Sequence, residues 1–180
     1  MSKQFISTVD LVILGFLSEK PMSAYDLAQL IEEKHASKLV KISTPTVYKN
    51  CKRLFADGFL SGKTTQKTKQ PEKTVYSLTK KGTERFAFLM AHFSSNIEPI
   101  FFNFNAFIYH LGKLNKRDGL KMLKNLHDEL SKFKIWIAQH EKEESESLAF
   151  PNKAIVKQYR MIATTLYTWG DEVMRDYQKL

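Results

Sequence analysis

The first third of the chain carries apolar residues at helical spacing. The earliest such segment, residues 8–18, has an apolar side built from Val9, Leu11, Val12, Leu14 and Phe16. After a short turn, Ser23 and Asp26 form a capping-box pair of the kind that begins a helix. The pattern therefore predicts two helices, one over residues 8–18 and one from Ser23 to about residue 34.

A third helix is predicted after the Ser-Thr-Pro sequence at 43–45. Thr44 is a suitable cap, and Pro45 suits the first turn because that position needs no backbone N–H. An Asp-Gly pair at 57–58 ends the helix, since glycine readily adopts the left-handed conformation found after a helix C-terminus. The apolar side of this helix is expected to hold Val47, Cys51, Leu54 and Phe55.

Two short segments after residue 58 have the pattern of β-strands. One opens at Phe59-Leu60, and residues 74–78 alternate between apolar and polar side chains, as a strand with one buried face does. The stretch between them, 62–73, is polar and rich in Lys, so we expect a hairpin with a long basic tip. Thr79 then caps a helix that continues through Phe93.

The second half of the chain is built from longer helical patterns. Residues 97–111 are too apolar for one exposed helix face and must be covered. Two further helices are predicted, one starting at Asn115 with Asp118 and one near Pro151. Their apolar positions recur at alternating steps of three and four, the heptad spacing of helices that pack along their length. The two seams consist of Leu123, Leu126, Leu130, Phe133 and Ile137, and of Ile155, Tyr159, Ile162, Leu166, Trp169 and Val173.

These seams have two candidate partners, since they can pack against each other within one chain or against a second copy. Two amphipathic helices and an apolar run exceed what one small N-terminal domain can cover, so we favour a homodimer. We therefore expect a mainly α protein with two domains. Residues 1–85 form a winged helix-turn-helix with a two-stranded β-wing, and residues 86–180 form a helical dimerisation domain.

Composition agrees with a helical fold and locates the charge. The chain has 7 Gly and 5 Pro among 180 residues, too few for the many tight turns of an all-β fold. Its formal net charge is +9, and residues 38–85 alone hold twelve Lys and Arg against three Asp and Glu, an excess equal to that net charge. Such a concentrated basic segment indicates a polyanionic partner, although a solvated Lys-rich surface has the same composition.

Hydroxyl and cationic side chains gather on the predicted third helix and on the hairpin. In a winged helix-turn-helix the third helix enters the major groove of DNA, and the wing lies along the backbone or in the minor groove. The candidate DNA-binding residues are Ser43, Thr44, Thr46, Tyr48, Lys49, Lys52, Arg53, Lys63, Lys67, Lys69 and Lys73. Tyr48 has a second interpretation as a packing residue between helix and wing. Tyr25 could touch a phosphate or simply pack.

Other kinds of site are not indicated. Cys51 falls on the apolar side of the third helix, so we expect a buried thiol rather than a redox switch. The five histidines show no metal-ligand spacing, and no Gly-rich phosphate loop, G-x-S-x-G turn or HExxH motif indicates an enzyme. No segment has the length of a membrane span or the features of a secretory signal. We therefore expect a cytoplasmic protein that has no cofactor and binds no metal.

Four stretches of the chain resemble the PadR family of transcriptional regulators. They are LVILGFL at 11–17, PMSAYDL at 21–27, STPTVYKNCKRLFADGFL at 43–60 and VYSLTKKG at 75–82. The helical remainder is similar to the longer branch of that family, whose C-terminal helices dimerise. The resemblance implies a dimeric regulator, usually a repressor, that binds an operator in double-stranded DNA and is released by a small molecule.

The same resemblance places Tyr48 and its neighbours on the recognition helix and residues 69–73 at the wing tip. This tip, Lys-Gln-Pro-Glu-Lys, differs from the Gly-Arg-Pro-Arg type common in the family, so it lacks the arginines that would enter a minor groove. The aromatic residues between 101 and 109, together with Trp136 and Trp169, form either a pocket for a small hydrophobic or phenolic effector or part of the core.

Two alternatives to a sequence-specific regulator stay open at this point. One is a protein-interaction module that uses the winged helix only as a scaffold. The other is a nonspecific architectural DNA-binding protein, which the lysine-rich wing would suit because lysine is a flexible point charge with little geometric selectivity.

Overall fold

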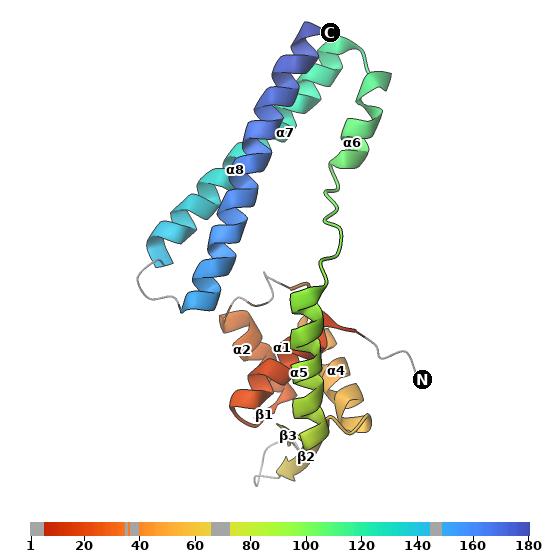
Figure 1. The fold of residues 1–180 in the computed structure, drawn as a ribbon, viewed down its shortest axis with the longest axis vertical. Coiled ribbons are helices and arrows are strands. Elements are labelled where there is room, and N and C mark those ends of the chain that lie inside the picture. The colour runs from red at the N-terminus through yellow and green to blue at the C-terminus, as the bar shows by residue number, and fades with distance from the viewer. Residues whose placement is uncertain (1–5, 35, 37–39, 66–72, 145–148) are drawn as a thin grey trace. The chain divides into compact units, whose positions relative to one another are not determined.

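The computed structural model describes residues 6–34, 36, 40–65, 73–144 and 149–180 (Figure 1). They divide into two compact units, Met1–Pro99 and Ile100–Leu180, each of which is described by itself. In the described part of the chain, no helix combines the length and the apolar character that crossing a membrane requires.

The first unit is a winged helix. Its elements in chain order are α1 (Thr8–Glu19), β1 (Met22–Ser23), α2 (Ala24–Glu33), α4 (Thr44–Ala56), β2 (Leu60–Thr65), β3 (Lys73–Leu78) and α5 (Lys80–Ser95). The three strands form an antiparallel sheet in the order β1-β3-β2. The predicted helices and the two-stranded wing are confirmed. The additional strand β1 has only two residues, too few to show the alternation that reveals a strand.

Side-chain caps fix where the helices of this unit begin. Ser23 and Thr79 accept hydrogen bonds from the backbone N–H groups of Asp26 and Gly82, at 3.2 and 3.0 Å, as predicted. The predicted cap of α4 is wrong by one residue. Ser43 is its N-cap, and the Ser43 hydroxyl lies 2.8 Å from that of Thr46 instead of bonding to a backbone N–H.

One core holds the first unit together. Its most deeply buried apolar side chains are Ile13, Leu14, Leu27, Ile31, Val47, Cys51, Leu54, Leu60 and Leu89. Phe55, predicted for the apolar side of α4, is instead 47% exposed, and its ring packs edge-on against Tyr76 of β3 at 6.0 Å. Leu89 of α5 also belongs to this core, and the compact unit extends to Pro99. The domain boundary after residue 85 stays a prediction.

Close contacts join the end of α4 to the beginning of α5. Gly58, at φ 76°, turns the chain after α4, and the Thr79 hydroxyl donates a hydrogen bond to its carbonyl oxygen at 2.8 Å. A Cβ on Gly82 would collide with the carbonyl oxygen of Phe59, so glycine is required there by close backbone approach. These contacts join the end of α4 to the start of α5.

The second unit is a helical hairpin preceded by short helical turns. Its elements are α6 (Asn105–His110), the 3₁₀ turn η1 (Leu111–Lys113), α7 (Lys116–Glu144) and α8 (Phe150–Lys179). Asn115 caps α7 by accepting from the N–H of Asp118 at 2.9 Å, as predicted. The two long helices lie side by side and run in opposite directions (Figure 1).

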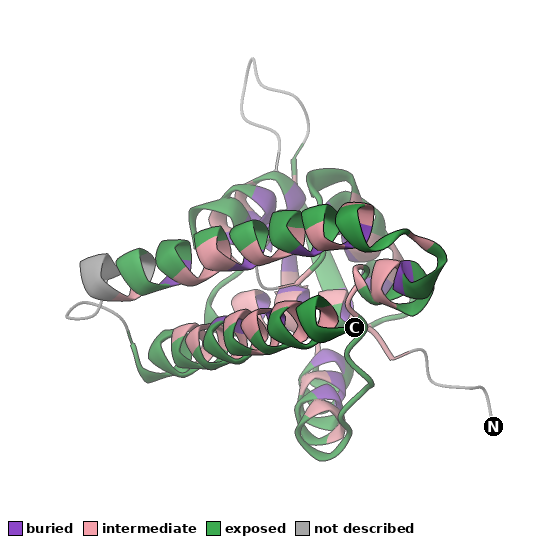
Figure 2. Cartoon of the chain, turned by 90° about the horizontal axis from the view of Figure 1, so that it is seen from above, coloured by how far each residue is buried: buried purple, intermediate pink, exposed green. Residues whose placement is uncertain are grey.

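The two heptad seams are only partly used inside the chain. Leu123, Leu130 and Ile137 of α7 are buried, and Ala163 and Gly170 are the buried positions of α8. Every predicted seam residue of α8 is half-buried, as are Leu126 and Phe133 of α7, and exposed positions recur along both helices (Figure 2). Small residues thus let α8 approach α7 closely. The larger seam side chains remain partly accessible.

The aromatic run before α7 is divided between packed and exposed rings. Phe102 and Phe104 stack at 5.2 Å, and Phe104 lies 5.5 Å from Trp169 of α8. Phe101 and Tyr109 are 84% and 85% exposed. Part of the run therefore packs against the hairpin, whereas part of it faces outwards.

Candidate nucleic-acid interface

Helix α4 has a buried side and an exposed side. Val47, Cys51 and Leu54 recur at steps of four and three and point into the core. This burial fixes the rotation of the helix about its axis. The predicted site residues lie on the other side. Thr46 and Arg53 are half-buried, and the exposed ones are Ser43, Thr44, Tyr48, Lys49 and Lys52.

Arg53 joins α4 to α1 through an ion pair with a buried carboxylate. Asp10 on α1 is completely buried, and one of its carboxylate oxygens binds Nη2 of Arg53. The guanidinium also donates to Asn50 Oδ1 at 3.0 Å and lies 3.2 Å from Asp57 Oδ2. The sequence predicts Arg53 as a DNA-binding residue, whereas the structure gives its guanidinium intramolecular partners that hold α4 in place.

Asn50 is a residue that the sequence pattern does not single out. Its side-chain amide donates to the carbonyl oxygen of Thr46 at 2.8 Å, and its oxygen accepts from Arg53. Asp10 is also missed by the sequence reasoning, although an acid among the apolar residues of 8–18 is a usable signal, because a buried carboxylate requires a partner. Both residues bind the Arg53 guanidinium and so help to hold α4 in place.

The wing contributes cations with different surroundings. Lys63 on β2 is exposed, whereas Lys73, the first residue of β3, forms an ion pair with Asp26 of α2 at 2.8 Å. The predicted contacts Lys67 and Lys69 lie outside the described residues. Beside α4, Gly62 gives Phe55 room to lie against the wing, because a Cβ there would come within 3.1 Å of the Phe55 ring.

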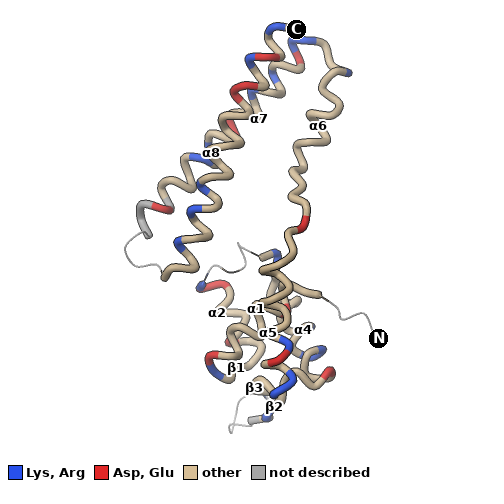
Figure 3. The backbone as a smooth tube through the Cα atoms, viewed as in Figure 1, with Lys and Arg blue, Asp and Glu red and all other residues tan. Residues whose placement is uncertain are grey.

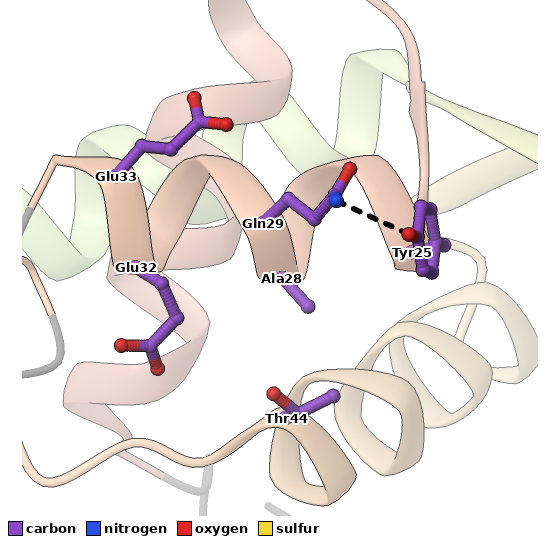
Figure 4. A pocket seen from close by; sticks show the side chains of 6 residues that line it. All are labelled: Tyr25, Ala28, Gln29, Glu32, Glu33 and Thr44. Carbon is purple, nitrogen blue, oxygen red and sulfur yellow. Dashed lines mark hydrogen bonds between the residues drawn. The ribbon is translucent and has the colours of Figure 1, made fainter.

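A shallow hollow lies between α2 and the start of α4. Its volume is about 380 Å³, and it is lined by Tyr25, Ala28, Gln29, Glu32, Glu33 and Thr44 (Figure 4). Tyr25 is 55% exposed, and its hydroxyl accepts a hydrogen bond from Gln29 at 3.1 Å. Tyr25 is therefore a surface residue next to the candidate interface.

Some of the basic residues in the first unit make contacts within the chain. Lys and Arg positions occur in the wing strands and in the first turns of α5 (Figure 3). Lys81 donates to the carbonyl oxygen of Asp57 at 2.8 Å, and the buried Arg85 lies over the rings of Phe59 and Phe88 at 5.8 and 5.3 Å. Part of the excess of residues 38–85 therefore stabilises the fold.

Cys51 is completely buried, and burial raises the pKa of its thiol to about 12. Its thiolate is therefore a negligible species at neutral pH, in agreement with a packing role. Among the described residues, no group of three or more His, Cys, Asp or Glu side chains is arranged to hold a metal ion.

Comparison with known proteins identifies the architecture. Residues 13–87 match the transcriptional regulator PadR-like family. No protein of curated function matches the chain in sequence.

Solved structures extend the likeness over nearly the whole chain. The chain is similar to Bacillus subtilis PadR in complex with operator DNA, with 16% identity and a TM-score of 0.77 over 97% of this chain and 99% of that chain. The same protein in complex with p-coumaric acid has 14% identity and a TM-score of 0.73, over 98% of this chain and 99% of that chain. The Vibrio cholerae virulence activator AphA has 18% identity and a TM-score of 0.67, over 96% of this chain and 99% of that chain. These likenesses confirm the predicted fold, a winged helix followed by a helical region.

The Asp10–Arg53 pair predicts a large effect of one substitution. Arg53→Met leaves the buried carboxylate without its cation, so the free energy of unfolding is expected to fall by about 3 kcal/mol in urea denaturation. Lys52→Met, at an exposed neighbouring position, should change it by less than about 0.5 kcal/mol.

Adding Asp10→Asn to Arg53→Met should restore part of the loss, because a neutral amide costs less to bury than a carboxylate. Equal stabilities of Arg53→Met and Lys52→Met would show that the ion pair does not support the helix.

Proposed function

We propose that this protein, whose residues 13–87 match the transcriptional regulator PadR-like family, belongs to that family and is a homodimer that binds a two-fold symmetric DNA operator and represses transcription until a small molecule releases it. The observation that carries the proposal is the exposed side of α4. Hydroxyl groups and lysines stand there on a helix whose rotation is set by its buried residues. A helix presented in this way can enter the major groove.

Each side chain has a proposed role in this complex. Hydroxyl groups at the start of α4 suit phosphates and base acceptors, while lysines suit phosphates. The proposed contacts are Ser43, Thr44, Thr46, Tyr48, Lys49 and Lys52 on α4, with Lys63, Lys67 and Lys69 on the wing. We assign Arg53 a positioning role, because its guanidinium binds Asp10 and Asn50.

The dimer is proposed to form through the second unit. The seam residues of α8 are half-buried in the single chain, and Met161 beside them is 57% exposed. Covering such a stripe with its two-fold copy would remove apolar surface from water. Two recognition helices would then meet half-sites about one DNA turn, roughly 34 Å, or a multiple of it apart.

Regulation by an effector would act on the same assembly. The rings of Phe102, Phe104 and Trp169 form an aromatic cluster, and the similar Bacillus subtilis PadR is known in complex with p-coumaric acid. We infer a small hydrophobic or phenolic ligand. A ligand that favours one dimer geometry over another changes operator affinity through linkage. Because the proposed target is chromosomal DNA, we place the protein in the cytoplasm.

Operator binding is tested by mobility shift on DNA from upstream of the protein's own gene, compared with random DNA at physiological salt. We expect a clear preference for the upstream DNA. Lys49→Ala and Lys52→Ala should each reduce the slope of log K against log salt by about 0.9, because each removes one phosphate contact. Lys124→Ala, an exposed lysine of α7, should leave the slope unchanged.

Two results would contradict this part of the proposal. Equal affinity for all DNA would favour an architectural protein, and absence of binding would favour a protein-interaction module.

Dimerisation is tested by sedimentation equilibrium. The wild-type protein should have twice the mass of one chain, and Leu166→Glu should yield a monomer of unchanged helical content, because a charge would enter the proposed interface. Thr165→Glu, at the adjacent exposed position, should remain dimeric. A monomeric wild-type protein, or a dimeric Leu166→Glu variant, would refute the proposed seam.

The effector is tested by thermal shift with small phenolic acids. A ligand at a hundred times its Kd stabilises the folded state by about 2.7 kcal/mol, so it should raise the Tm and release the operator. Phe104→Ala should weaken both effects, because it removes the ring that lies between Phe102 and Trp169. An unchanged Tm together with unchanged operator binding across such compounds would count against an effector of this class.

A further inference from the structure

The structure assigns Asp26 and Lys73 a common role, and we propose that they form a latch that sets the direction of the wing, so that Lys73 positions the wing and does not contact a phosphate. This inference rests on the proposed DNA-binding function. It revises the interpretation of one cation that sequence alone assigns to DNA, and it gives a function to an acidic residue that sequence indicates only as a cap.

The latch joins three elements at one point. Lys73 begins β3, and its Nζ atom lies 2.8 Å from the carboxylate of Asp26 in the first turn of α2. The Ser23 hydroxyl, at the end of β1, donates to the same carboxylate at 2.8 Å and accepts from the Asp26 N–H at 3.2 Å. The capping pair that begins α2 therefore also holds the base of the wing.

The position of Lys73 in the sheet explains why such a contact is useful. Strand β1 pairs with β3 only at Met22–Tyr76 and Ser23–Val75. Lys73 lies two residues before Val75, beyond the end of that pairing, and opposite Thr65 at the last pair among the described residues of the wing. The latch therefore connects the wing to α2 at a level where β1 no longer pairs with β3.

Charge and geometry both favour an intact pair at neutral pH. The hydrogen bond from Lys73 is the largest influence on the Asp26 carboxyl and lowers its pKa, against the opposing effect of burial. The ammonium group of Lys73 also lies 5.8 Å from the centre of the Tyr25 ring. A lysine whose charge is already met by a carboxylate contributes little to counterion release on DNA.

The latch and the net charge predict opposite effects of Asp26→Asn on DNA affinity. Asp26→Asn raises the net charge by one, which by itself tightens binding to a polyanion. The latch requires the reverse, because a wing without a fixed direction loses more conformational entropy on binding. Glu33→Gln is the matched control, since it makes the same charge change at an exposed position of the same helix.

The experiment measures Kd for the preferred DNA at several salt concentrations, with hydroxyl-radical footprints of each complex. We expect Asp26→Asn and Lys73→Met each to weaken binding about three- to fivefold, the worth of one exposed ion pair, with an unchanged salt slope. The double variant should be no weaker than either single variant. Protection should be lost at the flanks under the wing and kept at the centre under α4, which general destabilisation of the fold would not produce.

Several results would overturn the latch. The latch would be refuted if Asp26→Asn bound DNA as tightly as the wild-type protein or more tightly, which is the result expected for the control Glu33→Gln. A salt slope reduced by about one in Lys73→Met would show that this lysine contacts a phosphate after all. Failure of the wild-type protein to prefer any DNA would remove the proposed function and the latch together, whereas normal wild-type binding with unaffected variants would remove the latch alone.

Discussion

The ion pair between the buried Asp10 and the half-buried Arg53 is the interaction on which the arrangement of the first unit depends. Asp10 has no exposed surface, so its charge must be met inside the protein, and the partner comes from the middle of α4. The pair fixes α4 along α1, while Val47, Cys51 and Leu54 fix its rotation. An apolar contact of equal area would hold the helix less specifically, because it has no preferred direction.

The basic residues of the first unit fall into two classes. Arg53, Lys73, Lys81 and Arg85 contact carboxylates, carbonyl oxygens or aromatic rings of their own chain. Lys49, Lys52 and Lys63 stand on exposed surface. The basic residues between 49 and 85 therefore have two different surroundings, because one class makes contacts within the chain and the other lies on exposed surface that we propose contacts a phosphate backbone.

Local sequence is a good guide wherever local physics decides the outcome. The caps at Ser23 and Thr79, the turn at Gly58 and the two wing strands depend on neighbouring residues and are predicted correctly. Strand β1, the Asp10–Arg53 pair and the Asp26–Lys73 pair join residues far apart in the chain, so no spacing reveals them. Phe55 has the helical phase of a core residue but lies against the wing instead, a choice made by tertiary packing. The candidate site is predictable as a helix and a wing, but the intramolecular contacts of Arg53 and Lys73 are not.

The most direct test of the central claim is selection of bound fragments from genomic DNA by the purified full-length protein, followed by sequencing. The proposed dimer, which would present α4 twice in one fixed orientation, predicts a single enriched motif with two-fold symmetry. The centres of its half-sites should be separated by about one helical turn or a multiple of it. Recovery of fragments with no shared motif would contradict the account.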